Sequence, residues 1–137
     1  MIVRIARFPD QAALAAELAR VLTAAVPGAD VSLRGSLAAG TADEYSDIDL
    51  AWVVPDGDVG RCVALLPELP ASVADLASAR SDPDYQRSAL RRLVFVRFRG
   101  LPLFWRLDLE VWAVSHAFDE HADVGNPRAR GDEWSLA

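Results

Sequence analysis

The aspartates Asp47 and Asp49 are the residues of this sequence with the clearest capacity for chemistry. Residues two apart in a strand project from the same face, roughly 6.5 to 7 Å apart along it. Two neighbouring carboxylates repel each other, and a divalent cation bound between them removes that repulsion. Two such cations about 3.5 to 4 Å apart could activate an attacking oxygen and stabilise a leaving phosphate. The pair alone is equally typical of two solvated aspartates on the open face of an antiparallel sheet.

A third carboxylate lies in the alternating stretch RLDLEVW, residues 106–112. Alternation places Asp108 and Glu110 on one face of a strand, with the leucines and the valine on the other. If this strand lies beside the one that carries Asp47 and Asp49, Asp108 comes within about 5 Å of one of them. Three carboxylates from adjacent strands suit Mg²⁺, which prefers oxygen ligands. We therefore predict a metal site of Asp47, Asp49 and Asp108, with Glu110 as the alternative third acid or a nearby base.

A turn at Gly35 and Ser36 precedes the run Leu37-Ala38-Ala39, which favours a helical turn. Glycine lets a ligand approach the backbone, and the free N–H groups of a helix start attract phosphate oxygens. The Ser36 hydroxyl would add one more donor. For these two residues alone, a tight turn with an N-cap serine is the simpler interpretation.

Composition excludes several other kinds of site. All 14 basic residues are arginine, so the chain has neither a phosphate-loop lysine nor a lysine for a Schiff base. Two histidines and one cysteine are too few for a His/Cys zinc site, and we expect His116 and His121 at surface or loop positions. The net charge of −6 argues against broad binding to nucleic-acid backbone. No apolar run approaches the roughly 20 residues that span a bilayer, and the single Cys62 suits a reducing cytoplasm.

Hydrophobic periodicity indicates the elements that must position these residues. A helix is predicted over residues 10–26, with Asp10 as its N-cap and Pro27-Gly28 at its end. The predicted strands cover residues 31–34, 47–54, 93–98 and 103–114, and the last two form a hairpin. We also expect an edge strand or lead-in over residues 2–8, two short helices over 58–81, and a helical segment over 85–91.

These elements predict one α/β or α+β domain over residues 1–137, with a mixed, mostly antiparallel β-sheet flanked by helices. The final residues, GDEWSLA, read as the first turn of a helix that stops. They indicate either a ragged end or a chain that continues into a helical region.

Four aromatic residues and the cysteine have simpler interpretations. Cys62, Trp52 and Trp105 fall on apolar faces and are expected in the core. Trp112 shares the face of Asp108, so it either packs in the core or walls a pocket. Tyr45 could border the site.

The joint pattern of Gly35-Ser36, nine residues, and then Ser46-Asp47-Ile48-Asp49-Leu50 resembles the nucleotidyltransferase superfamily that includes DNA polymerase beta. More narrowly, it looks like the minimal and antibiotic-modifying branches. A glycine at position 40 and a small residue at position 42 also fit the pattern. The resemblance covers residues 33–54 and, less closely, 103–112.

The resemblance implies a role for each matching residue. Gly35 and Ser36 would hold the triphosphate of ATP or another nucleotide, with Ser46 beside them. Asp47 and Asp49 would bind two Mg²⁺ ions, with Asp108 as the third acid. An acceptor oxygen would then attack the α-phosphorus, and pyrophosphate would leave.

The resemblance leaves the acceptor open. One reading is an enzyme that moves AMP onto a hydroxyl of a small molecule such as an antibiotic. The alternatives are an antitoxin-type regulatory protein that binds or adenylylates a helical partner, and an inactive relative that only binds nucleotide; a homodimer is compatible with each. Many minimal members carry arginines near Leu37 and Ala39. Here the missing charge could come from Arg34 or from the later run that comprises Arg87, Arg91, Arg92, Arg97 and Arg99, most of which would otherwise form a solvated basic face.

Overall fold

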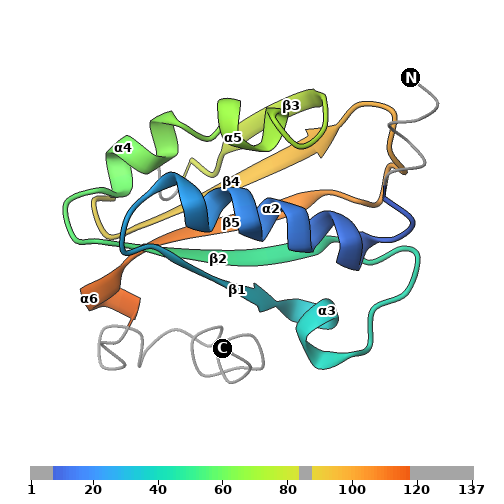
Figure 1. The fold of residues 1–137 in the computed structure, drawn as a ribbon, viewed down its shortest axis with the longest axis horizontal. Helices are drawn as coiled ribbons and strands as arrows, with labels where there is room; N and C mark the ends of the chain where they lie inside the picture. The colour runs from blue at the N-terminus through green and yellow to red at the C-terminus, as the bar shows by residue number, and fades with distance from the viewer. Residues whose placement is uncertain (1–7, 84–87, 118–137) are drawn as a thin grey trace.

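A five-stranded sheet in the order β1-β2-β5-β4-β3 organises the protein, whose computed structural model describes residues 8–83 and 88–117 (Figure 1). Its strands are β1 (Asp30–Arg34), β2 (Ile48–Val54), β3 (Leu76–Ser81), β4 (Arg91–Phe98) and β5 (Leu107–Ala113). The β2–β5 pair is parallel, and the other three pairs are antiparallel. The predicted mixed, mostly antiparallel sheet is confirmed.

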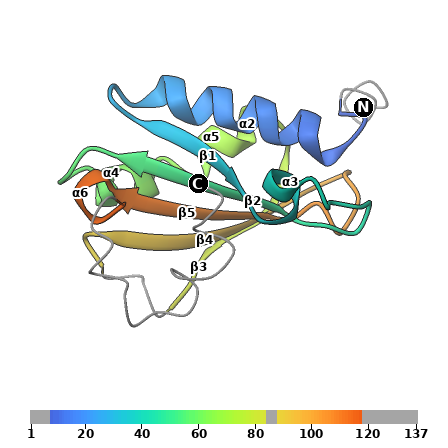
Figure 2. The ribbon, with the colours of Figure 1, turned by 90° about the horizontal axis from the view of Figure 1, so that it is seen from below.

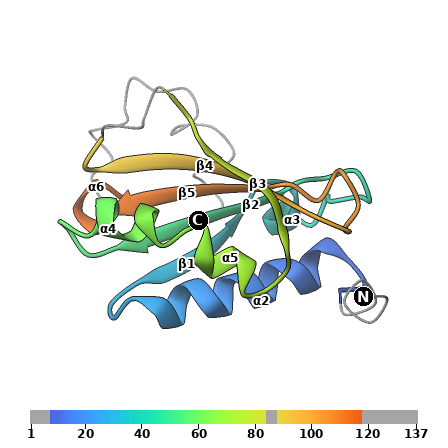
Figure 3. The same ribbon diagram turned by 90° about the horizontal axis from the view of Figure 1, so that it is seen from above.

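The helices are α2 (Gln11–Ala25), α3 (Gly35–Ala39), α4 (Val59–Ala64), α5 (Glu68–Ala71) and α6 (Val114–Ala117). Helices α2 and α5 lie on the same side of the sheet (Figures 2 and 3). Buried side chains of α2 and α4 form one hydrophobic core with the inward-facing residues of β2, β4 and β5. Within residues 8–83 and 88–117, no helix has the length and hydropathy to cross a membrane.

Helix α2 forms where the periodicity predicts it. The Asp10 carboxylate caps the helix by accepting a hydrogen bond from the Ala13 N–H at 2.9 Å. Leu14, Leu18 and Leu22 recur on one face and are almost completely buried. Trp52 of β2 donates its indole N–H to the Leu22 carbonyl at 3.1 Å, which fixes the helix against the centre of the sheet.

Alternation of apolar and acidic residues at the start of β2 and of β5 sets the two faces of the sheet. In β5, Leu107 and Leu109 are fully buried on the helix-covered face, and Asp108 points the other way. A register slip of one residue would exchange these faces, exposing leucines that each contribute about 1.5 to 3 kcal/mol by burial. Core packing therefore also fixes the side from which the acidic side chains project. Trp52, Trp105 and Cys62 are buried in the core, as predicted.

The middle of the chain differs from the prediction. Residues 58–81 contain the two short helices α4 and α5, but residues Leu76–Ser81 form the edge strand β3 rather than helix. The segment LASARS is mostly exposed and poor in β-branched or aromatic residues, so it carries little strand signal of its own. Its pairing with β4 creates the strand.

Three other boundaries need comment. The predicted helix over 85–91 is wrong where it can be checked, because residues 88–90 are not helical and Arg91 begins β4. Strand β5 begins at Leu107 rather than at residue 103, since residues 102–105 form a turn closed by a hydrogen bond from the Trp105 N–H to the Pro102 carbonyl. The predicted strand or lead-in over 2–8 falls almost entirely outside the described residues, as does the C-terminal segment GDEWSLA.

Candidate active site

The three predicted acidic residues converge on the face of the sheet opposite α2. Strands β2 and β5 run parallel and in register, so Asp49 lies directly opposite Asp108, while Asp47 stands immediately before β2. One carboxylate oxygen from each residue lies within 4.8 Å of the other two, and all three side chains are partly buried. We call Asp47, Asp49 and Asp108 the carboxylate triad.

The carboxylate triad has the donor set that a hard divalent cation requires. Oxygen ligands on opposite sides of Mg²⁺ lie about 4.2 Å apart, twice the usual metal–oxygen distance. Only one pair among three ligands can stand opposite, and adjacent ligands lie about 3 Å apart, so triad oxygens up to 4.8 Å apart would have to draw closer to share one ion. Three oxygen ligands with partial solvent access also leave positions for water and phosphate oxygens.

Gly35 makes room for one of these carboxylates. Its φ of +63° lies in the left-handed region, and a Cβ built at this position would be 2.3 Å from Oδ2 of Asp49. The glycine is therefore required both by the backbone and by the close approach of Asp49. Ser36 follows in α3 with a partly buried side chain, and its carbonyl accepts a hydrogen bond from the Thr41 N–H at 3.0 Å. The turn and the triad thus form one packed unit.

Ser46 helps to hold the turn that leads into Asp47. Its hydroxyl accepts a hydrogen bond from the Asp43 N–H at 3.0 Å and donates to the Asp43 carboxylate at 3.2 Å. Gln11, buried at the start of α2, donates its side-chain amide to the carbonyls of Asp43 and Ser46 at 2.7 and 3.3 Å. Residues 43–46 are therefore anchored to the helix. The sequence gives no signal for this role of Gln11.

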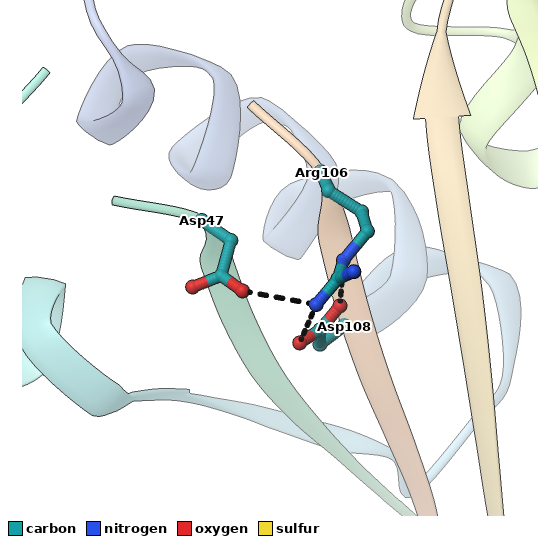
Figure 4. A network of polar contacts seen from close by, with 3 residues as sticks. All are labelled: Asp47, Arg106 and Asp108. Atoms are coloured by element: carbon teal, nitrogen blue, oxygen red, sulfur yellow. Dashed lines mark hydrogen bonds and ion pairs between the residues drawn. The ribbon is translucent and has the colours of Figure 1, made fainter. Parts of the chain in front are cut away.

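Arg106 is a second residue, after Gln11, whose place at the site was not predicted from the sequence. Its guanidinium bonds to both Asp108 oxygens, at 2.8 and 3.1 Å, and to Oδ2 of Asp47 at 3.3 Å (Figure 4). The hydrogen bond to Asp108 is the main cause that raises the pKa of Arg106. Burial raises the pKa of Asp108, the hydrogen bond from Arg106 lowers it, and the nearby Asp47 charge raises it further. The signal was available, because Arg106 precedes Asp108 by two residues in an alternating stretch.

Glu110 belongs to a different cluster. Its carboxylate pairs with Arg91 at 2.7 Å and with Arg34 at 3.8 Å, and all three side chains are buried. The group of acids close enough to share a cation contains Asp108 and not Glu110. The geometry therefore favours Asp108 over Glu110 as the third acid.

The cluster continues to aromatic residues. The Arg91 guanidinium lies 4.8 Å from the ring centroid of Trp112, and that ring stacks on His116 at 4.6 Å. Trp112 is buried on the Asp108 face, away from the main core. His116 lies in α6 and is partly buried rather than in a surface loop, while His121 lies outside the described residues.

Some of the arginines that could replace the missing phosphate contacts are buried, and others are exposed to solvent. Arg34 and Arg91 are buried against Glu110, and Arg92 donates to the Ser88 carbonyl at 2.7 Å. Arg97 and Arg99 are exposed, as expected of a solvated face, and Arg87 lies outside the described residues. Leu37, one of the two departures from the family pattern, packs against the core. Packing against the core thus explains why an apolar residue stands at position 37.

Two cavities bear on the site, and only the first of them is lined by members of the carboxylate triad. One, of about 290 Å³, lies against the open face of the sheet and is lined by Arg34, Asp49, Leu50, Asp82, Leu93, Phe95, Asp108 and Glu110. The other, of about 610 Å³, lies between the start of α2 and the loops 42–45 and 102–105. Its wall includes Leu37 and the exposed Tyr45, whose ring meets Phe104 edge-on at 5.0 Å. Tyr45 therefore borders a cavity that adjoins the chain segment leading to Asp47.

Comparison with solved structures identifies relatives of this fold. An RNA terminal U-transferase described as cytoplasmic, GLD-2 in its complex with RNP-8, and the RNA terminal uridylyl transferase Cid1 each align with a TM-score of 0.54. Their sequence identities are 19%, 14% and 21%, over 77%, 81% and 74% of this chain. The aligned part covers 30%, 38% and 29% of those chains, so this chain spans less than two fifths of their length.

The sequence itself matches a family. No curated protein matches the chain, but the family model for the nucleotidyltransferase domain matches residues 15–94. That range holds more than half of the 137 residues and includes the Gly35-Ser36 turn, Asp47 and Asp49. Asp108 lies beyond the match, and the parallel pairing of β2 with β5 brings it to the same place. The chain belongs to the nucleotidyltransferase-domain family, and its sheet has the fold of the DNA polymerase beta-like nucleotidyltransferases.

Proposed function

We propose that this protein transfers a nucleoside monophosphate, most simply AMP from ATP, to a hydroxyl of a small molecule. The observation that carries the proposal is the convergence of the carboxylate triad to within 4.8 Å on the fold of this family. Asp47, Asp49 and Asp108 would hold two Mg²⁺ ions. Bound there, the ions would neutralise phosphate charge and increase the acidity of the attacking hydroxyl.

The chain's own residues would mainly supply position. Gly35 keeps the backbone close to Asp49, and the N–H groups and hydroxyl of the Gly35-Ser36 turn would hold phosphate oxygens. Gln11 and Ser46 would hold the turn that sets the direction of Asp47. Such placement is the main demand of phosphoryl-type transfer, which depends on alignment and charge neutralisation more than on covalent chemistry by the protein.

Charge and cavity size support a small acceptor. The chain carries a net charge of −6, which disfavours a nucleic-acid backbone. The 290 Å³ cavity that Asp49 and Asp108 line lies near the lower end of the range of about 300 to 1,000 Å³ that is usual for small-molecule sites. Its wall combines the Phe95 ring with acidic residues and Arg34, which suits a hydroxylated compound such as an antibiotic. The single cysteine, a buried free thiol, supports a reducing cytoplasmic location.

The proposal is tested by measuring Mg²⁺-dependent pyrophosphate release from each nucleoside triphosphate. The acceptor panel contains hydroxylated antibiotics and, as the competing class, an RNA oligonucleotide with a free 3′ hydroxyl. We expect the double variant Asp47→Asn/Asp49→Asn to lose activity by at least about 10³-fold. Asp58→Asn, a surface aspartate paired with Arg61, is the control and should remain active.

The outcomes separate the parts of the proposal. If the double variant releases pyrophosphate as fast as the wild type, the transfer reaction does not occur at the carboxylate triad. If only the RNA oligonucleotide is extended, the small-molecule acceptor is wrong and the reaction class stands.

A further inference from the structure

The guanidinium of Arg106 joins two members of the carboxylate triad across neighbouring elements. It forms a two-pronged pair with Asp108 on β5 and reaches Oδ2 of Asp47, the residue before β2, at 3.3 Å (Figure 4). Its backbone is fixed as well, because the Arg106 carbonyl accepts a hydrogen bond from the Ile48 N–H at 2.8 Å. The backbone of Arg106 is therefore held beside the triad even when its guanidinium group changes partner.

Exposure distinguishes this arginine from the pair around Glu110. The side chains of Arg34 and Arg91 are 2% and 6% exposed, so their ion pairs with Glu110 are sealed from water. The side chain of Arg106 is 42% exposed, and those of Asp47 and Asp108 are 38% and 18% exposed. A partly solvated ion pair exchanges partners at small cost, whereas a buried one does not.

A divalent cation and the Arg106 guanidinium need the same oxygens. A carboxylate oxygen that accepts a charge-assisted hydrogen bond has less electron density to offer a cation, and two positive groups at one site repel each other. The guanidinium fork also matches the geometry of a phosphate group. Such a group would reach the site with a nucleotide and could take the place of the carboxylates.

We propose that Arg106 is the internal counter-ion of the carboxylate triad: it competes with a divalent cation for Asp47 and Asp108, and it transfers to the nucleotide phosphates when the cation binds. This inference rests on the proposed metal site. Arg106 would then bind the substrate directly and supply the positive charge that Leu37 and Ala39 do not provide. Metal binding and nucleotide binding are coupled through one side chain that changes partner.

The experiment measures Mn²⁺ binding without nucleotide, by titration calorimetry or by the free-ion electron paramagnetic resonance signal. Arg106→Ala should bind Mn²⁺ about tenfold more tightly than the wild type, because charge-assisted hydrogen bonds no longer oppose the cation. Arg106→Lys, which keeps the charge and loses the two-pronged pair, should fall between them. The same Arg106→Ala variant should bind a non-hydrolysable ATP analogue several-fold more weakly.

Arg80→Ala is the matched control. The Arg80 and Arg106 guanidinium carbons each lie 5.3 Å from the ring centroid of Phe95, and no ion pair links Arg80 to the triad within the described residues. Its removal deletes the same charge from the same face and should leave Mn²⁺ affinity unchanged. Opposite signs for metal and nucleotide affinity in Arg106→Ala are expected of a shared counter-ion, whereas general loss of structure would weaken both.

Nuclear magnetic resonance of the wild type covers the case in which Arg106→Ala does not fold. The Nε–H of Arg106, assigned by its disappearance in Arg106→Lys, should shift when Mg²⁺ is added. An unmoved signal at saturating Mg²⁺, or equal Mn²⁺ affinities in the wild type and Arg106→Ala, overturns the counter-ion role alone. If neither the wild type nor any variant binds Mn²⁺, the metal site of the proposed function fails with it.

Discussion

At the scale of single residues, the space beside Gly35 is shared with the Asp49 carboxylate. A methyl group at position 35 would collide with Oδ2 of Asp49 at 2.3 Å, and the φ of +63° disfavours any side chain. We expect Gly35→Ala to displace Asp49 and to weaken Mn²⁺ affinity by about tenfold or more, the value of one charged ligand contact. The cost of placing an alanine in this left-handed conformation should by itself lower the free energy of unfolding by about 1 to 2 kcal/mol.

Gly40→Ala separates these two effects. Gly40 also has a left-handed φ, of +75°, but a Cβ there meets no atom within 4 Å. The variant should show the same loss of thermal stability with unchanged Mn²⁺ affinity. Equal metal affinity in Gly35→Ala and Gly40→Ala would show that Asp49 does not depend on the space at Gly35.

The residues of the candidate site were predictable to different degrees. Asp47, Asp49 and Asp108 follow from alternation, because a strand with one apolar face leaves its acids on the other. Arg106 lay in the same pattern, but its partner depends on the distance between two strands that only the fold sets. Gln11 was not predictable, since a glutamine after an N-cap has no periodic signature and its acceptors lie more than 30 residues away.

At the scale of elements, the start of α2 performs two separate tasks through neighbouring residues. Asp10 caps the helix, whereas Gln11 holds the 43–46 turn through the carbonyls of Asp43 and Ser46. Asp10→Ala should cost about 1 kcal/mol of stability and leave the turn in place. Gln11→Ala should free the turn, so that the backbone amides of Tyr45 and Ser46 exchange with solvent faster and the rate of pyrophosphate release falls several-fold.

Hydrogen–deuterium exchange with mass spectrometry compares the two variants directly. Peptides that cover residues 41–47 should exchange faster in Gln11→Ala and at the wild-type rate in Asp10→Ala. Equal exchange in both variants would mean that the turn holds its shape without the helix.

The helices and strands were predictable where the hydrophobic periodicity is strong. The α2 periodicity, and the apolar faces of β2 and β4, predicted helix and strands close to their observed bounds. Strand β3 was missed because its residues are small or polar and its conformation is imposed by β4. Apart from the hairpin of β4 and β5, the strand order β1-β2-β5-β4-β3 could not be predicted from the sequence. No local pattern indicates which strand lies between β2 and β4.

At the scale of the whole molecule, one exposed contact links the loop after β2 to the start of α6. The Asp56 carboxylate accepts a hydrogen bond from the Ser115 N–H at 3.0 Å, and this bond lowers the pKa of Asp56 below its ordinary value of 3.8. A lowered folded-state pKa means that the charged form is favoured by folding. The contribution of Asp56 to folding stability is therefore present above pH 3.8 and is lost as the pH falls through the folded-state pKa.

Asp56→Asn tests this contribution, because asparagine keeps an acceptor oxygen and removes the charge. The variant should unfold at a slightly lower temperature than the wild type at pH 6, and the difference should vanish in acid below the folded-state pKa. Thermal melts followed by circular dichroism at several pH values measure it. A difference that persists unchanged in strong acid would assign the effect to something other than the Asp56 charge.

The parallel pairing of β2 with β5 has a consequence for how the site comes into being during synthesis. Asp49 and Asp108 face each other in register although 58 residues lie between them in the sequence. Closing such a long loop is slow compared with forming α2 or the hairpin of β4 and β5. Asp47 and Asp49 are therefore synthesised well before Asp108, and the three carboxylates come together only when β5 pairs with β2.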